Sequence, residues 1–456
     1  MKSNVPVVSH SRTSKTPIEL VIQGGTAVTM VPGQKPIPNA RVLINKGLIN
    51  EIGPSSEIPI PQGLSVETID AQDAIIMPGL VNAHAHTAMT LFRGFADDLP
   101  LNQWLFDKIF PAEANFLSPE TVYWGALLGC AEMIASGTTC FADGYFFQDQ
   151  TVRAVHEAGL RALVAQGIID FPAPGVPDPR ENIHVGQDFL KRWRHFSDRI
   201  TPGLFCHSPA TCSEKTLRRS HEISREHGVP LQIHLSETAS EVSEIIKISG
   251  QRPTHYLDHL GLVDPGLIAA HGVHLDETEI RCLHKRGAKM VHVPESNMKL
   301  SSGIAPLRRM IAMGVTTGLG TDGCASNNNL DLFGEMDTAA KLAKVSTQSP
   351  EDVKAYHVLQ MATLGGAAAL GLDKKTGSLE KGKKADIIVV DLKAPHLCPM
   401  FDPVSALVYS ASGADVKDVV VNGIVLMKER EFRSLDQEEI MAKVREISKG
   451  IQCKSR

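Results

Sequence analysis

The sequence predicts an α/β fold: a (β/α)8 TIM-like barrel with a small composite β-sandwich domain formed by both termini. Two observations carry this prediction. Short apolar segments alternate with helical segments over about 300 residues in the middle of the chain, as parallel strands joined by helices do. Both ends are instead rich in β-branched residues broken by Gly and Pro. We therefore expect residues 1–75 in the sandwich, 76–372 in the barrel, and 373–456 in the sandwich with a terminal helix.

The barrel strands are predicted from eight apolar segments: Ile75–Val81, Thr138–Ala142, Ala162–Gln166, Gly203–His207, Leu231–Leu235, Leu267–His271, Lys289–Val293 and Val315–Leu319. Helical patterns lie between them, for example Ser118–Ala135, Ser213–His227 and Asp276–Arg286. An open doubly wound sheet is the alternative. That fold favours a glycine-rich phosphate turn after its first strand, and a histidine-rich segment stands there instead.

The sandwich strands are predicted at four places: Glu19–Met30, Ala40–Gly53, Ala385–Leu392 and Val416–Met427. In the last of these, Asn422-Gly423 separates two valine-rich runs, a strong hairpin signal. Neither end alone has enough strands for a stable sheet. We expect both ends to join in one sandwich, and two separate flexible arms are the alternative.

Composition and charge restrict the function. With 43% hydrophobic and 21% charged residues, the chain resembles ordinary soluble globular proteins. A net charge of -5 gives no support for nucleic acid or anionic membranes as partners. Eight scattered cysteines without a CxxC pair indicate reduced thiols. The first seventeen residues are polar, without a signal-peptide core, and we expect a loosely ordered tail. No apolar stretch is long enough to cross a bilayer, so a cytoplasmic location is expected.

Histidines mark the end of the first predicted barrel strand. His84 and His86 are two residues apart, so in a strand both imidazoles point to the same side. An HxH pair alone is a weak signal, because the chain has 18 histidines. Its position at the carboxyl end of an apolar strand strengthens it, since barrel enzymes keep their active sites at that end.

Three other strands end in similar side chains, namely His234, His271 and Asp322, and Glu237 follows closely after His234. Any one of these histidines alone is more simply explained as a hydrogen-bonded core residue. Their shared position at strand ends favours a common site. Imidazole and carboxylate ligands suit Zn²⁺ or a similar divalent ion. Such an ion lowers the pKa of a bound water to about 7, so the pattern predicts hydrolytic chemistry.

Several motifs resemble the amidohydrolase superfamily: PGLVNAHAHTAMTLFRG, IHLSET, AAHGVH and GLGTDGCASNN. Within it they are similar to the 5-methylthioadenosine/S-adenosylhomocysteine deaminases, which are related to the triazine hydrolases. The similarity extends over nearly the whole chain. The resemblance implies a barrel with one metal, a composite β-sandwich, and commonly a homo-oligomer. It predicts a hydrolytic deaminase that acts on 5'-methylthioadenosine, S-adenosylhomocysteine or adenosine.

The resemblance also assigns roles to residues. It implies a metal held by His84, His86, His234 and Asp322. It further implies three catalytic residues, namely Glu237, His271 and Asp322. In that mechanism His271 lies beside the attacking water, and Glu237 and Asp322 move protons, in an order that the sequence leaves open. Because the fourth strand leads to Cys206-His207-Ser208 without a lysine, we expect one divalent metal, with Zn²⁺ preferred and Fe²⁺ or Mn²⁺ as alternatives.

Two local expectations concern the strand ends. In a regular strand, Glu237 would face away from His234 three residues earlier, so we expect the strand to end before Glu237. The sequence alone leaves open whether His271 or His274 is the active histidine. The resemblance implies His271, which stands at a strand end.

Four further residues are expected to contact the nucleoside substrate: Glu113, Arg180, His207 and Trp104, together with Glu237. By resemblance, Glu113 binds the ribose hydroxyls, His207 contacts the substrate, and Arg180 lies near its tail. Trp104 would form an apolar wall or only anchor a loop. Some relatives carry a second arginine where this chain has Gln166, and a glutamine cannot make the bidentate contact of an arginine with a carboxylate. That favours methylthioadenosine or adenosine at least as much as S-adenosylhomocysteine.

Two alternatives remain open. The same machinery could act on another ring, such as guanine, a pterin or a triazine, because the metal site reads only an electrophilic ring carbon. A catalytically inactive scaffold is the more remote alternative, since such chains usually lose metal ligands and this one retains the whole set.

Overall fold

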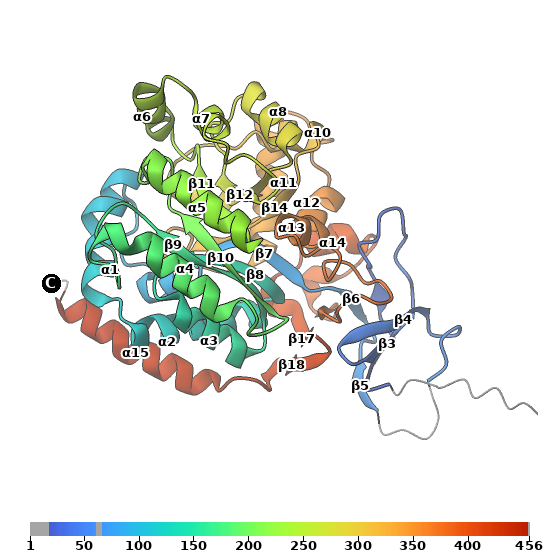
Figure 1. The fold of residues 1–456 in the computed structure, drawn as a ribbon. Coiled ribbons are helices and arrows are strands. Elements are labelled where there is room, and N and C mark those ends of the chain that lie inside the picture. Colours follow the sequence, from blue (N-terminus) through green and yellow to red (C-terminus); the bar gives the residue numbers. More distant parts are fainter. Residues whose placement is uncertain (1–17, 61–65, 455–456) are drawn as a thin grey trace, which may run out of the picture.

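The structure is a computed structural model that describes residues 18–60 and 66–454, with the fold shown in Figure 1. The loosely ordered tail expected at residues 1–17 lies outside the described residues. Within the part described, no helix is long and apolar enough to span a bilayer.

The centre of the molecule is a sheet of parallel strands in the order β14-β13-β12-β11-β10-β9-β8-β7-β15. Its strands are β7 (Leu80–His86), β8 (Thr138–Tyr145), β9 (Arg161–Ile168), β10 (Ile200–Cys206), β11 (Leu231–Leu235), β12 (Leu267–His271), β13 (Lys289–His292), β14 (Thr317–Leu319) and β15 (Asp322–Gly323). The eighth predicted strand, Val315–Leu319, corresponds to β14, which pairs with β13, and a further short strand after it, β15, pairs with β7. The short segment between β14 and β15 therefore joins the two edges of the sheet, and the predicted TIM-like barrel is confirmed.

Helices surround this sheet (Figure 1). They are α1 (Phe110–Phe116), α2 (Pro119–Ala135), α3 (Gln148–Ala158), α4 (Asn182–Trp193), α5 (Glu214–His227), α6 (Ala239–Ser249), α7 (Pro253–His259), α8 (Glu277–Arg286), α9 (Pro294–Lys299), α10 (Leu307–Ala312), α11 (Leu332–Thr347), α12 (Ala355–Met361) and α13 (Leu364–Ala369). The side chains of Ser118, Ser213 and Asp276 accept backbone N–H groups at the starts of α2, α5 and α8. These caps fix the helix starts where the sequence pattern placed them.

Short helical turns and two C-terminal helices complete the elements. They are η1 (Thr87–Phe92), η2 (Gln103–Ile109, a π-helix), η3 (Pro179–Glu181), η4 (Pro395–Leu397), η5 (Gly413–Asp415), α14 (Pro403–Tyr409) and α15 (Gln437–Lys454). The terminal helix α15 packs along α2 on the outside of the barrel.

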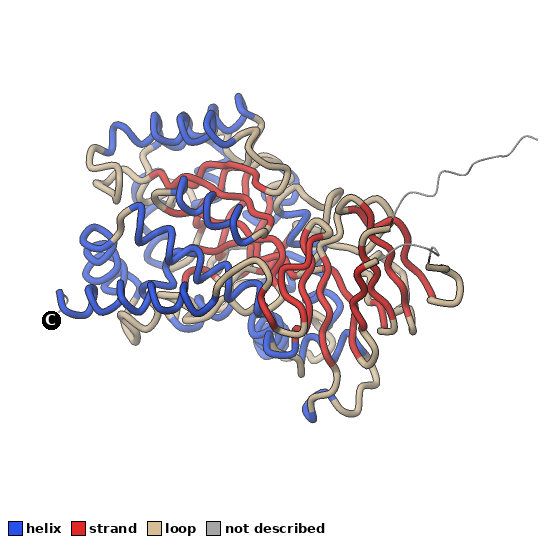
Figure 2. The backbone as a smooth tube through the Cα atoms, turned by 90° about the horizontal axis from the view of Figure 1, so that it is seen from below, coloured by secondary structure: helices blue, strands red, loops and turns tan. Residues whose placement is uncertain are grey.

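Two further sheets form the sandwich, at one end of the molecule (Figure 2). Their orders are β4-β3-β1-β5 and β19-β18-β17-β16-β6-β2. The strands are β1 (Leu20–Gln23), β2 (Thr26–Ala27), β3 (Ala40–Asn45), β4 (Leu48–Pro54), β5 (Glu67–Asp70), β6 (Ala74–Pro78), β16 (Ile387–Asp391), β17 (Val416–Val421), β18 (Ile424–Lys428) and β19 (Glu431–Phe432). Because β6 pairs with β16, the two ends of the chain share one sheet, as predicted.

The predicted hairpin is present between β17 and β18. Asn422 and Gly423 both adopt positive φ, at 51° and 78°. A two-residue turn of this kind matches the right-handed twist of the flanking strands.

The strand predicted as Ile75–Val81 is wrong in one respect, because it is two strands. β6 belongs to the sandwich, and β7 is the first strand of the barrel. The chain passes from one to the other at Gly79, where an added Cβ would lie 2.1 Å from the side chain of Thr139. Only a glycine allows this close approach. The domain boundaries after residues 75 and 372 stay predictions.

A buried ion pair connects the two parts of the fold. Arg161, at the start of β9, donates through Nε to Asp386 Oδ2 (2.7 Å) and through Nη2 to Asp386 Oδ1 (3.2 Å). The backbone N–H of Asn422 also donates to Asp386 (2.8 Å). The two side chains are 1% and 0% exposed, so each charge depends on the other.

We predict that Arg161→Met lowers the melting temperature strongly. It leaves the Asp386 carboxylate buried without its partner, and breaking such pairs costs about 3–5 kcal/mol. The control is Arg281→Met, which removes an exposed pair with Glu277 and should cost at most about 0.5 kcal/mol. Thermal unfolding followed by circular dichroism measures both, and equal shifts for the two variants would contradict the prediction.

Candidate metal centre and active site

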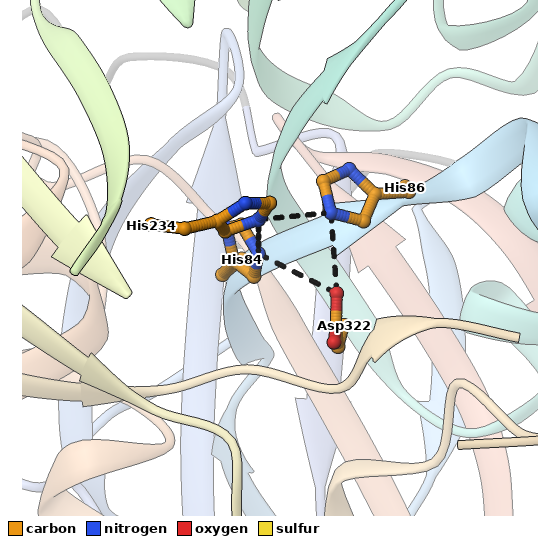
Figure 3. Close-up of side chains that lie close together, drawn as sticks. All are labelled: His84, His86, His234 and Asp322. Carbon is orange, nitrogen blue, oxygen red and sulfur yellow. Dashed lines mark hydrogen bonds and ion pairs between the residues drawn. The ribbon is translucent and has the colours of Figure 1, made fainter. Parts of the chain in front are cut away.

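A cavity of about 170 Å³ opens at the carboxyl ends of the barrel strands. Its walls come from η2, α1, the ends of several strands and the first turns of α6. Four side chains converge at its base, and one ligand atom from each lies within 4.8 Å of all the others (Figure 3): His84, His86, His234 and Asp322.

The contacts within this cluster are direct. His234 Nε2 lies 3.3 Å from His86 Nε2 and 3.2 Å from His84 Nε2. Asp322 Oδ1 lies 3.2 Å from His86 Nε2 and 3.5 Å from His84 Nε2. Three ring nitrogens and one carboxylate oxygen therefore face a common point.

The protonation of His84 and His234 suits a cation, whereas the hydrogen bond and charge of Asp322 raise the pKa of His86. The Nδ1–H of His86 donates to the carbonyl of Gly144 (2.5 Å), so a neutral ring carries its lone pair on Nε2, toward the cluster. Burial lowers the pKa of His84 to about 4. Burial, with the nearby His271, lowers the pKa of His234 well below its usual value. Neutral imidazoles and a carboxylate are the donor set that zinc and similar divalent ions accept, so the residues present fit such an ion.

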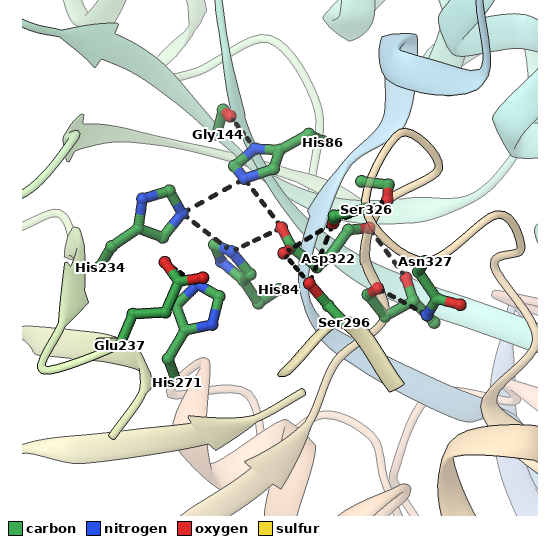
Figure 4. A network of polar contacts seen from close by, with 12 residues as sticks. His84, His86, Gly144, His234, Glu237, His271, Ser296, Asp322, Ser326 and Asn327 are labelled. Atoms are coloured by element: carbon green, nitrogen blue, oxygen red, sulfur yellow. Dashed lines mark hydrogen bonds and ion pairs between the residues drawn. The ribbon is translucent and has the colours of Figure 1, made fainter. Parts of the chain in front are cut away.

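Hydrogen bonds hold the carboxylate of Asp322 in place. Its Oδ2 accepts from Ser296 Oγ (2.7 Å) and Ser326 Oγ (3.0 Å), as Figure 4 shows. With Oδ2 occupied, Oδ1 faces His84 and His86. Asp322 itself has a positive φ of 61°, a conformation uncommon for a residue other than glycine, so the surrounding contacts determine its position.

Glu237 and His271 lie beside the cluster (Figure 4). Asn297 Oδ1 lies 2.9 Å from His271 Nδ1, and His271 Nε2 lies 3.6 Å from Glu237 Oε2. Burial raises the pKa of Glu237, which favours its protonated form. His274, by contrast, donates through Nε2 to the carbonyl of Ser302 (2.8 Å) and does not line the cavity.

The expected end of the strand before Glu237 is confirmed. β11 ends at Leu235, and Ser236 turns the chain with a positive φ of 51°. The carboxylate of Glu241 accepts the N–H of Ser236 (3.0 Å) and that of Glu237 (2.8 Å). This turn directs Glu237 toward the same cavity as His234.

Three of the four remaining predicted contacts line the cavity: Glu113, His207 and Trp104. Glu113 is buried on α1 and accepts a hydrogen bond from the hydroxyl of Tyr145 (2.6 Å). Burial raises the pKa of Glu113 to about 7. Burial lowers the pKa of His207 to about 3, so its ring is neutral, and its Nδ1 lies 2.9 Å from Thr211 Oγ1.

The structure does not bring Arg180 to this site. Its side chain is 87% exposed and pairs with Asp178, and it does not line the cavity. Asp178 also accepts the N–H of Arg180. The guanidinium is therefore held beside the start of η3.

Sequence reasoning missed the residues that support the site: Tyr145, Glu241, Ser296, Asn297 and Ser326. A signal for three of them was present, because Tyr145 ends β8, and Ser296 and Asn297 follow β13 closely. Glu241 lies within a helix, and its contact with the preceding turn follows only from the three-dimensional structure.

Comparisons with known proteins agree with this geometry. Residues 75–426 match the amidohydrolase family. A 5-methylthioadenosine/S-adenosylhomocysteine deaminase of Syntrophobacter fumaroxidans is 45% identical over 433 residues, which cover 95% of this chain and 98% of that protein. A 5'-deoxyadenosine deaminase of Methanosarcina barkeri is 46% identical over 427 residues, 93% of this chain and 96% of that protein.

A solved structure extends the comparison to three dimensions. The crystal structure of an adenosine deaminase from Xanthomonas campestris with bound zinc is 38% identical, with a TM-score of 0.93, and the match covers 96% of this chain and 99% of that one. The resemblance read from the motifs is thereby confirmed. The chain belongs to the amidohydrolase family.

Proposed function

We propose that this protein is a metal-dependent deaminase of adenine nucleosides of the 5'-methylthioadenosine and S-adenosylhomocysteine class, releasing ammonia and the inosine analogue. The observation that carries the proposal is the combination of a three-histidine, one-aspartate cluster with Glu237 and Glu113 in one cavity. The names of the relatives support it. The decisive experiment measures ammonia release from adenosine, methylthioadenosine, S-adenosylhomocysteine, guanine and a triazine.

One divalent ion, zinc by preference, would be held by His84, His86, His234 and Asp322. Fe²⁺ and Mn²⁺ are alternatives, because this donor set tolerates several divalent ions. Zinc in the adenosine deaminase structure supports the preference. When bound, such an ion supplies a water whose pKa is lowered to about 7.

The protein's own side chains then move protons. Asp322 accepts a proton from the attacking water, which the Nε2 of His271 orients toward ring carbon C6. Glu237, whose protonated form is favoured because burial raises its pKa, donates to ring N1, so that negative charge does not accumulate on the ring. Asp322 then gives its proton to the amine, which leaves as ammonia, while the proton of the new C6 hydroxyl passes to the Glu237 carboxylate and restores its protonated form. Each of these steps is general acid–base catalysis.

Glu113 supplies the contact that distinguishes a nucleoside from a free base. A carboxylate accepts hydrogen bonds from both hydroxyls of a ribose, and the hydroxyl of Tyr145 fixes one of its oxygens. His207 and Trp104 contact the remainder of the nucleoside. A ribose-binding carboxylate has no role with guanine, a pterin or a triazine, so Glu113 separates the proposal from these alternatives.

We also propose that the protein acts as a homo-oligomer in the cytoplasm, without nucleic-acid or membrane partners. The net charge of -5 supports the absence of nucleic-acid and membrane partners, and the scattered cysteines support the cytoplasmic location. The homo-oligomer rests on the family resemblance.

The purified protein should contain one equivalent of metal per chain. Removal with a chelator should abolish ammonia release, and added Zn²⁺ should restore it. His84→Asn should hold less than a tenth of the metal, because it removes one of four donors, whereas His255→Gln, outside the cavity, should keep it. Elemental analysis measures both, and full metal content in His84→Asn would refute the ligand assignment.

Glu237→Gln should keep the metal but lose turnover. A glutamine cannot donate an acidic proton to the ring, and removing a general acid lowers kcat by roughly 10²- to 10⁴-fold. Steady-state kinetics on folded, metal-loaded protein measures the loss. Near-normal kcat in this variant would remove Glu237 from the mechanism.

Glu113 should produce a pH dependence of nucleoside turnover. With a pKa raised to about 7, its carboxyl is ionised above pH 7 and protonated below, where it loses one acceptor for the ribose. The kcat/KM for methylthioadenosine should therefore fall as the pH drops through 7. Glu113→Gln should make this fall less steep, because the ionisation of the attacking water then contributes alone, and should raise KM at least tenfold at pH 8, since a hydrogen bond to a charged group contributes about 1.5–3 kcal/mol. Unchanged nucleoside kinetics would favour the alternatives with a free ring.

A further inference from the structure

The lining of the cavity is rich in carboxyl groups and contains no permanent cation among the described residues. Of the described residues that line the cavity, none is lysine or arginine. Its acidic lining side chains are Glu113, Glu237, Glu241, Glu244 and Asp322. Beyond the metal proposed at its base, the cavity therefore offers a 5' substituent no lysine or arginine among the described lining residues.

The outer wall is apolar. It is formed largely by η2 and its neighbours, with side chains from Leu101, Trp104, Leu105, Phe106, Phe110 and Leu300. Trp104 is buried, and its Nε1 has no hydrogen-bond partner among the described residues. Aromatic and aliphatic side chains of this kind suit a methyl group or a thioether, because sulfur makes favourable contacts with aromatic rings.

The two positions considered above for a tail-binding arginine do not supply a cation to the cavity. Arg180 lies outside the cavity and pairs with Asp178. Gln166 is buried and donates through Nε2 to the carbonyl of Gly167 (3.3 Å). A carboxylate on the substrate would thus find no bidentate guanidinium partner.

We propose that this cavity selects adenine nucleosides whose 5' substituent carries no carboxylate, such as 5'-methylthio or 5'-deoxy compounds. The inference rests on the proposed nucleoside deaminase function and narrows its substrate class. A carboxylate tail would lose water against the apolar wall without gaining a paired charge, and it would lie near the carboxylate of Glu244, which is repulsive. An ammonium group on the tail would instead be attracted to Glu244, so a zwitterionic homocysteine tail is disfavoured less than a carboxylate alone.

The test uses two substrates of almost equal shape: 5'-S-(2-carboxyethyl)-5'-thioadenosine and its carboxamide. The kcat/KM for the carboxylate should be at least tenfold lower than that for the carboxamide, and S-adenosylhomocysteine should lie between them. High salt should reduce the difference, because it screens repulsion near the solvent-exposed rim.

A charge reversal tests where the discrimination arises. Glu244 is exposed on α6 at the cavity, and Glu244→Arg should raise the carboxylate-to-carboxamide ratio of kcat/KM at least fivefold. The matched control is Ser243→Arg, which adds the same charge one residue away, at an exposed position that does not line the cavity, and should leave the ratio unchanged.

Two results would overturn the proposal. One is an equal kcat/KM for the carboxylate and the carboxamide. The other is a selective loss of carboxylate turnover in Arg180→Ala, which would mean that Arg180 reaches the tail. Failure of the deaminase function itself would appear differently, as no ammonia from methylthioadenosine either. In that case calorimetry measures the dissociation constants of the carboxylate and the carboxamide nucleosides instead. Equal dissociation constants for the two would overturn the proposed selectivity.

Discussion

Three imidazole nitrogens and a carboxylate oxygen face one another in a buried cluster, and no arrangement of protons turns all four of their contacts into hydrogen bonds. The Nε2 of His234 lies near those of both His84 and His86, but a single N–H can donate to only one well-aligned acceptor. A divalent cation removes this conflict, because it accepts every lone pair together. The barrel makes the cluster possible by bringing the carboxyl ends of parallel strands to one side.

The residues around the cluster hold its side chains in position, which the strands alone would not do. Ser296 and Ser326 occupy one oxygen of Asp322, and Glu241 fixes the turn before Glu237. Such supporting contacts orient ligands and acid–base groups to within fractions of an ångström. These carboxyl groups also make the cavity acidic. The residues that carry out the reaction therefore also influence which substrates can enter.

Much of this arrangement could be read from the sequence where the signal is local. Strand ends marked by His84, His234 and His271, the helix caps and the Asn422-Gly423 turn each depend on a few neighbouring residues. The features that could not be read have a different cause. The division of one apolar run at Gly79 depends on the approach of Thr139, and the position of Arg180 in this structure depends on its pair with Asp178. The spacing of residues along the chain does not determine such contacts, so they could not be predicted from the sequence.

The pairing of β6 with β16 has a consequence for synthesis. Pro78 lies opposite Ile387 in the sheet, so β6 emerges from the ribosome roughly 300 residues before its partner exists. At the usual elongation rate of about 5–20 residues per second, that interval lasts roughly 15 to 60 s. During it, an apolar strand with an unpaired edge is available to other nascent chains. A fold that unites its two ends therefore makes the newborn polypeptide dependent on the barrel, or on a chaperone, for protection until translation is nearly complete.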